Sequence, residues 1–191
     1  MIKTKSYNHF DFDILEIKRY AKIYNTIEFD SLINECVNEI KDKLSYKVCY
    51  GVFPIKIKDN IVDFGEFTVK SNDLAGNLNG LNNAIIFAST IGIEIDRFIN
   101  KYSKISQTKA LIFQAIGAER IETLANAFNK EINHLYGETK PRFSPGYGDF
   151  SIEYQREIFK ILNCYKNIGL TLNDSLIMSP SKSVTAIIGI K

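Results

Sequence analysis

Residues 46–69, YKVCYGVFPIKIKDNIVDFGEFTV, decide the fold class because they contain two strand-like runs with no helix between them. The first run, 46–58, alternates in character and is rich in β-branched and aromatic residues. The second run, 60–69, follows a Lys-Asp-Asn turn. Short runs of this composition on either side of a turn predict a pair of β-strands.

Helical patterns and two further strands surround this pair. The longest helix is predicted from Gln107 to about Leu135, where apolar residues recur every three or four positions until Gly137 ends the pattern. The apolar run NAIIFAST, 83–90, is typical of a buried central strand, and 183–190 predicts a final strand. Shorter helices are predicted over 15–22, over 29–44 with Asp30 as N-cap, over 71–81, after Gly92, and over 152–163.

Helices and strands therefore do not alternate in regular βαβ order. Strands that come in pairs or at the end of a chain favour an α+β fold with an antiparallel or mixed sheet over a doubly wound sheet. At 191 residues the chain is expected to form one domain. Residues 1–82 supply N-terminal helices and the strand pair, and 83–191 supply the rest of that domain.

Composition excludes several classes of protein. A net charge of +2 without a dense Lys/Arg run argues against nucleic acid as a partner. Three cysteines with no CxxC pair argue against a disulfide scaffold or a zinc ribbon. The longest apolar stretch, 83–95, is too short to span a bilayer, and the first residues lack an apolar stretch of signal-peptide length. We therefore expect a cytoplasmic protein without a membrane partner.

Familiar catalytic and nucleotide-binding motifs are missing from the sequence. No G-x-G-x-x-G follows a strand, and there is neither a Walker A motif nor a G-x-S-x-G elbow. The two histidines, His9 and His134, stand outside any HExxH arrangement, and surface positions are expected for both. These absences argue against a self-contained hydrolase or metalloenzyme, and no metal site is predicted.

The segment RFSPGYGD, 142–149, carries the strongest functional pattern. Its Pro-Gly step predicts a turn, and glycines on both sides of Tyr147 leave a bare backbone that a ligand can approach. Arg142 adds a permanent planar cation with five N–H donors. The combination favours a loop that binds a small molecule, and the alternative is a surface turn with an ordinary arginine.

Two further places attract attention. Glu119 on the long helix has Ala115 and Ile116 at the preceding turn, so it is a candidate for partial burial, and a buried carboxylate needs a partner. The alternative is a surface glutamate that pairs locally with Arg120 or Lys130. Lys182 and Ser183 stand at the mouth of the last strand, where the alternative is a simple loop.

Two ordered motifs give the chain a resemblance to a known family. RFSPGYGD, then Gln155, then LTLNDSLIMSPSKSVTAIIG at 170–189 resemble the activation (reactivation) domain of cobalamin-dependent methionine synthase, and more closely its short free-standing bacterial relatives. The family pattern Arg-x-x-Pro-Gly-Tyr is matched within 142–147. The second signature is matched less closely, because Asn173 replaces the usual threonine; the similar residues are Leu172, Asn173, Ser175, Met178, Pro180, Ser183, Val184 and Thr185. The match is best over 83–191.

The resemblance implies a fold, a ligand and a partner. The fold is a twisted antiparallel sheet with surrounding helices. The ligand is S-adenosylmethionine, whose methyl group restores an inactive cob(II)alamin while a flavodoxin-type reductase supplies one electron. Since the chain has no cobalamin-ligand histidine motif, cobalamin is expected on a partner chain, a methionine synthase or another corrinoid protein. Methyltransferase-type activity is expected only together with that partner.

The resemblance also implies roles for single residues. Arg142 would take the ligand carboxylate, and backbone around Ser144, Gly146 and Gly148 would reach the adenine or ribose. Tyr147 would lie beside the sulfonium. An acid on the long helix would pair with the ammonium or sulfonium charge of the ligand, with Glu119 and Glu122 as competing choices. Pro145, Lys182 and Ser183 complete the predicted ligand-binding set. A late aromatic of the larger family members falls within 186–190, where this chain has none.

Two alternatives remain open at this stage. The first keeps the fold and drops the chemistry, giving a non-catalytic docking module for a corrinoid protein. It is motivated by the missing aromatic and by the lack of a counterpart for the family's N-terminal ligand aspartate. The second is an unrelated small-molecule enzyme on the same scaffold, and the scarcity of acid–base candidates argues against it.

Overall fold

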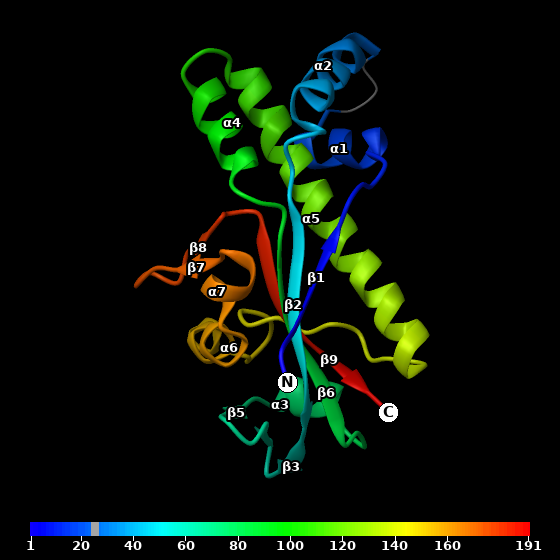
Figure 1. The fold of residues 1–191 in the computed structure, drawn as a ribbon, viewed down its shortest axis with the longest axis vertical. Helices are drawn as coiled ribbons and strands as arrows, with labels where there is room; N and C mark the ends of the chain where they lie inside the picture. The colour runs from blue at the N-terminus through cyan, green and yellow to red at the C-terminus, as the bar shows by residue number, and fades with distance from the viewer. Residues whose placement is uncertain (24–26) are drawn as a thin grey trace.

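The computed structural model describes residues 1–23 and 27–191, and an antiparallel sheet with helices on both faces forms its centre (Figure 1). The sheet has four strands in the order β1-β2-β6-β9. The predicted α+β class with an antiparallel sheet is confirmed. The strands are β1 (Lys3–Tyr7), β2 (Tyr46–Pro54), β6 (Asn83–Thr90) and β9 (Ser183–Ile190).

The central strands β2 and β6 carry the core on both faces of the sheet. All residues of β6 after Asn83 are buried, as the continuous apolar run predicts. Its register places Val48 of β2 opposite Ser89 and Ile188 of β9 opposite Ile85. The predicted central and final strands are therefore confirmed.

The predicted pairing of 46–58 with 60–69 is wrong for most of its length. β2 pairs with β1 and β6 instead. Most of its residues are buried, and a buried strand needs hydrogen-bond partners for the backbone along both of its edges. Only β3 (Lys56–Lys58) pairs with β4 (Ile61–Asp63), which also pairs with β5 (Thr68–Lys70). These three short strands form a separate small sheet.

Four helices cover one face of the large sheet, and three of them surround the upper half of the longest one, α5 (Figure 1). They are α1 (Ile14–Ala21), α2 (Asp30–Ile40), α4 (Glu94–Ser103) and α5 (Gln107–Tyr136), with the short 3-10 turn η1 (Ile27–Phe29) before α2. Asp13 caps α1 through its side chain, and Ser106 caps α5 in the same way. Asp30 is not the N-cap predicted for α2; it is the first helical residue, and its carboxylate pairs with Lys18 of α1.

The long helix α5 begins and ends as the sequence predicts, with Gly137 as its C-cap. Its apolar stripe is not uniform, however. Ile116 and Phe128 are buried, whereas Leu111 near one end and Leu135 near the other are exposed. The helix is 30 residues long, and parts of its apolar stripe stay exposed, so apolar spacing alone does not ensure burial.

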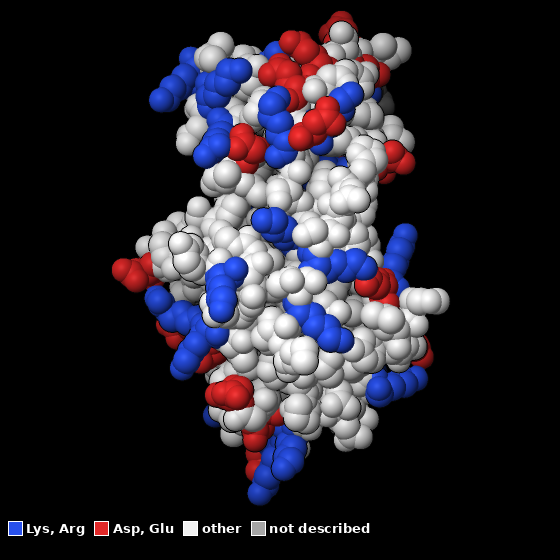
Figure 2. All heavy atoms as spheres, in the orientation of Figure 1, with Lys and Arg blue, Asp and Glu red and all other residues white. Residues whose placement is uncertain are grey.

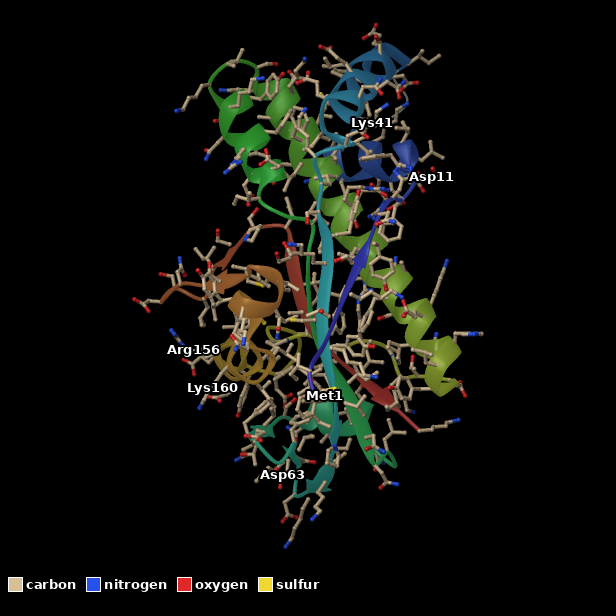
Figure 3. All side chains as sticks on the ribbon, in the orientation of Figure 1. Met1, Asp11, Lys41, Asp63, Arg156 and Lys160 are labelled. Atoms are coloured by element: carbon tan, nitrogen blue, oxygen red, sulfur yellow. The ribbon has the colours of Figure 1, made fainter. Side chains whose placement is uncertain are left out.

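The opposite face of the sheet is covered by short elements with their own apolar cluster. They are α3 (Asn72–Asn77), the 3-10 turn η2 (Ile152–Tyr154), α6 (Gln155–Leu162), α7 (Cys164–Ile168), and a hairpin of β7 (Thr171–Leu172) and β8 (Met178–Ser179). On α6, Ile158 and Leu162 are buried, while Arg156 and Lys160 point away from the sheet (Figure 3).

Surface charge of both signs is interspersed, densest at the helical end of the molecule (Figure 2). Across residues 1–23 and 27–191, no helix combines the length and hydropathy that a bilayer span requires. The same residues contain no group of three or more His, Cys, Asp or Glu side chains placed to hold a metal ion. Both histidines, His9 and His134, are exposed.

Candidate ligand-binding site

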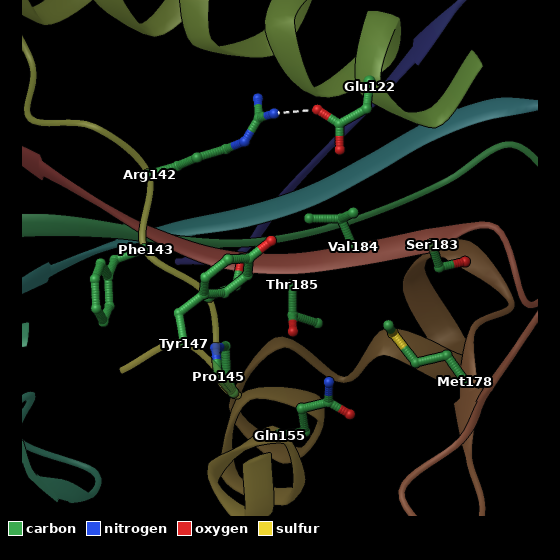
Figure 4. A pocket seen from close by; sticks show the side chains of 11 residues that line it. Glu122, Arg142, Phe143, Pro145, Tyr147, Gln155, Met178, Ser183, Val184 and Thr185 are labelled. Atoms are coloured by element: carbon green, nitrogen blue, oxygen red, sulfur yellow. Dashed lines mark hydrogen bonds and ion pairs between the residues drawn. The ribbon is translucent and has the colours of Figure 1, made fainter. Parts of the chain in front are cut away.

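A cavity of about 360 Å³ lies at the outer edge of β9, between α5, the 142–149 loop and α6 (Figure 4). Pockets for small organic ligands typically have volumes of about 300–1,000 Å³, so the size suits a ligand of that class. The residues that line it are Glu122, Arg142, Phe143, Ser144, Pro145, Tyr147, Gln155, Met178, Ser183, Val184 and Thr185.

The cavity begins where the backbone pairing along β9 stops. Phe143 N–H donates to the carbonyl of Ile187 at 2.8 Å, and Ile187 N–H donates back to Phe143 at 2.9 Å. In this antiparallel register the next pair outward is Pro145 with Thr185, and proline has no N–H to donate. Backbone groups two residues apart on a strand point to the same side, so the N–H and C=O of Thr185 face the cavity edge.

The loop 142–149 folds into the tight turn that its Pro-Gly step predicts. Gly146 has φ +96° and donates its N–H to the carbonyl of Phe150 at 2.7 Å, and Gly148 has φ +53°. A side chain at Gly148 would also overlap the carboxylate of Asp73. Both glycines therefore serve the loop backbone, which brings Tyr147 to the cavity with a 67% exposed side chain.

The carboxylate of Asp149 fixes the end of this loop to the start of α3. It accepts hydrogen bonds from the hydroxyl of Ser71 and from the backbone N–H groups of Asn72 at 2.7 Å and Asp73 at 3.2 Å. These bonds favour the ionised form, and they lower the pKa of Asp149 to about 2. The loop thus has an electrostatic anchor on the far side from the cavity.

This anchor predicts an acid-sensitive contribution to stability. The folded pKa of Asp149, about 2, lies below the unfolded value of about 3.9, so the contribution is complete above the unfolded pKa and is lost as the pH falls through about 2. Asp149→Asn is therefore expected to reduce the free energy of unfolding more at pH 7 than at pH 2.5. Urea denaturation at both pH values measures the difference, and an equal loss at both would contradict the assignment.

Arg142 points across the mouth of the cavity toward α5, and its side chain is 22% exposed (Figure 4). One terminal nitrogen donates to Glu122 at 2.5 Å and the other donates to Asn126 at 2.9 Å. The Nε–H and one N–H on each terminal nitrogen have no partner among the described residues. The site therefore has a positive and a negative side chain next to each other, and the guanidinium of Arg142 keeps N–H donors that are free to bind a ligand.

The structure places six of the predicted ligand-binding residues on the cavity lining and four outside it. Those on the lining are Glu122, Arg142, Ser144, Pro145, Tyr147 and Ser183; those outside it are Glu119, Gly146, Gly148 and Lys182. Of the two competing acids on α5, Glu122 is the one at the cavity.

Glu119 is buried and already has partners. Its carboxylate pairs with Arg120, its neighbour in sequence, and accepts from the hydroxyl of Thr123 at 2.8 Å. Lys182 lies with its aliphatic stem against Gly117 of α5, and burial lowers its pKa, while the nearby carboxylate of Asp96 opposes that shift. Both residues thus serve packing on the α5 side of the chain.

Five lining residues were absent from the predicted set: Phe143, Gln155, Met178, Val184 and Thr185. All five stand in or between the two motifs that carry the family resemblance, so the motif positions were the available signal. The late-aromatic region, 186–190, is buried in the sheet and does not contribute to the lining.

Among solved structures, the chain is similar to one described as "Crystal Structure of the MetH Reactivation Domain bound to AdoHcy". The TM-score is 0.74 at 13% sequence identity, and the match covers 100% of this chain and 78% of that chain. No family model and no curated protein matches the sequence. At this identity the likeness shows a shared fold, and it confirms the fold that the family resemblance implied.

Proposed function

We propose that the chain binds S-adenosylmethionine in the cavity beside β9 and serves as an activation subunit for a cobalamin-carrying methionine synthase. One observation carries the proposal: Arg142 and Glu122 stand together at a cavity of suitable size in a fold that was solved elsewhere with AdoHcy bound. The proposal needs the same cavity to accept S-adenosylmethionine and its demethylated product.

The charges of the cavity complement those of the ligand. The amino-acid end of S-adenosylmethionine carries a carboxylate and an ammonium group, which fit the unused N–H donors of Arg142 and the carboxylate of Glu122. The ring of Tyr147 is exposed at the cavity and can contact a sulfonium by a cation–π interaction. This arrangement holds both ends of a zwitterion and leaves the methyl-bearing sulfur near an aromatic ring.

The chemistry then depends on a partner chain. A cobalamin held by that partner would supply the cobalt that takes up the methyl group, and a flavodoxin-type reductase would supply the electron. The residues of this chain bind and orient the methyl donor, and S-adenosylhomocysteine, with a neutral sulfur, stays in the cavity when the methyl group has left. Cob(II)alamin remethylation is therefore a property of the complex.

Arg142→Ala is expected to weaken binding of S-adenosylmethionine by about ten- to a hundred-fold, because a hydrogen bond to a charged group contributes about 1.5–3 kcal/mol. Isothermal titration calorimetry on the full chain measures the change. Arg97→Ala is a matched control, since Arg97 lies on α4, has a 67% exposed side chain and pairs with Glu94, one turn away. Its affinity should equal that of the wild type.

Two results would count against ligand binding at this cavity. One is the absence of heat from the wild type at millimolar S-adenosylmethionine. The other is equal affinity in the wild type and Arg142→Ala, which would move the ligand elsewhere on the chain.

The docking-module alternative keeps one supporting observation, since the region of the late aromatic is buried and gives the cavity no side chain. Sedimentation with a purified cobalamin-binding methionine synthase separates the two functions. A complex that responds to S-adenosylmethionine supports an activation subunit. A complex that forms identically with and without it supports docking alone.

A further inference from the structure

Two buried polar side chains lie on the side of the cavity away from Arg142 and Glu122. Gln155, the first residue of α6, is 5% exposed, and Thr185 of β9 is 2% exposed. Figure 4 shows the Gln155 amide directed upward from α6 and the Thr185 hydroxyl directed down toward it. Both residues line the cavity, although Gln155 Oε1 and Thr185 Oγ1 themselves have almost no exposed surface in the empty cavity.

Neither polar group is satisfied within the described residues. The Oε1 of Gln155 and the Oγ1 of Thr185 are buried and have no hydrogen-bond partner there. Buried polar atoms are nearly always paired, because an unpaired one retains the full cost of leaving water. The backbone N–H and C=O of Thr185 face the same region, and Pro145 has no N–H to donate to that carbonyl. Unused donors and acceptors thus converge on one part of the cavity.

The walls of this region are apolar. The buried ring of Pro145 and the thioether of Met178 lie on either side of Gln155 (Figure 4). A flat group between them would be covered on its faces and would direct its edge at the amide. A purine ring has this flat shape, whereas a ribose with its hydroxyl groups does not.

We propose that Gln155, assisted by Thr185, reads the edge of a 6-aminopurine. A glutamine amide can accept from the 6-amino group and donate to N7 of adenine in a bidentate pair. The inference rests on the proposed function, because it assigns the base of an S-adenosyl ligand to the α6 side and its amino-acid end to Arg142. It adds a reason for the ligand to be an adenine nucleoside.

The test compares S-adenosyl-L-homocysteine with S-inosyl-L-homocysteine by isothermal titration calorimetry on the full chain. The two compounds share the thioether and the amino acid and differ only in the 6-amino or 6-oxo group. A site built to hydrogen-bond an N–H group rejects the analogue that lacks it. The wild type should bind the adenosyl compound at least about tenfold more tightly, the order of discrimination expected for one bidentate pair.

Gln155→Met removes the amide and keeps the length of the side chain. It should weaken binding of the adenosyl compound by about tenfold or more and that of the inosyl compound by less, because the inosyl base keeps N7 but has no 6-amino group to donate to the amide. Gln114→Met on the exposed face of α5 is the matched control. Gln155→Leu, which also lacks the amide, repeats the test if the methionine variant does not fold.

The outcomes separate this inference from the proposed function. Equal wild-type affinity for both compounds overturns the base assignment and leaves ligand binding intact. Equal weakening of both compounds by Gln155→Met also overturns it, because the residue would then act on the structure of the cavity. No binding of either compound at millimolar concentration overturns the proposed function together with the subsite.

Discussion

Arg120→Leu is expected to lower the free energy of unfolding by about 3–5 kcal/mol, the usual effect of removing one partner from a buried ion pair. The guanidinium of Arg120 is 0% exposed and pairs with the carboxylate of Glu119, which is 3% exposed. It also donates to the backbone carbonyls of Phe10 at 2.9 Å and Asp11 at 2.6 Å, and it lies 4.1 Å from the ring of Phe12. The variant therefore loses the link between α5 and the segment before α1 and leaves the buried carboxylate of Glu119 without its cation. Urea denaturation measures the loss.

Two control variants test whether the loss of stability in Arg120→Leu comes from the burial of the ion pair. Arg97→Leu breaks an exposed pair with Glu94 on α4 and should cost no more than about 1 kcal/mol. The double variant Glu119→Leu/Arg120→Leu should recover part of the loss, because replacing a whole buried pair by apolar side chains is often tolerated. Similar small losses for Arg120→Leu and Arg97→Leu would show that the buried pair does not hold the fold together.

Phe128→Ala is expected to cost about 3–5 kcal/mol, because it empties a large volume in the middle of the core. Phe128 is 1% exposed, and its ring centroid lies 5.1 Å from that of Tyr50 on β2 and 4.9 Å from that of Phe87 on β6. It therefore fastens α5, the helix that carries Glu122, to the two central strands. Thermal and urea denaturation both report the change.

Leu135→Ala is the matched control for Phe128→Ala. Both residues belong to the apolar stripe that the sequence predicts on α5, but Leu135 is 57% exposed. Its truncation should change the free energy of unfolding by no more than about 0.5 kcal/mol. A loss at Leu135 as large as that at Phe128 would mean that the end of α5 is covered in solution.

The fold could be predicted wherever burial follows a regular period. β6 and β9 are continuous apolar runs, and α5 has clear capping residues at both ends, so their positions were predictable. β1 was missed because none of its residues is fully buried, and its sequence KTKSY lacks an apolar alternation. The partners of β2 were mispredicted because strand pairing depends on distant segments, which local turn chemistry does not reveal.

The site could be predicted where a residue type or motif has a distinctive chemistry. Arg142, Pro145 and Tyr147 belong to a recognisable pattern and do line the cavity. The choice between Glu119 and Glu122 was open because residues three apart lie only about 60° apart around a helix. Gln155 and Thr185 belong to the family pattern, but nothing in the sequence assigned either of them a role in ligand binding. Their interest comes from burial without a partner, which appears only in three dimensions.

The backbone pairing along β9 stops next to a residue that has no amide hydrogen. In the register set by Phe143 and Ile187, a residue other than proline at position 145 could donate its N–H to the carbonyl of Thr185. That bond would extend the pairing of the loop with β9 into the edge of the cavity. Ligand binding to this chain thus depends on the ring of Pro145 as well as on the guanidinium of Arg142.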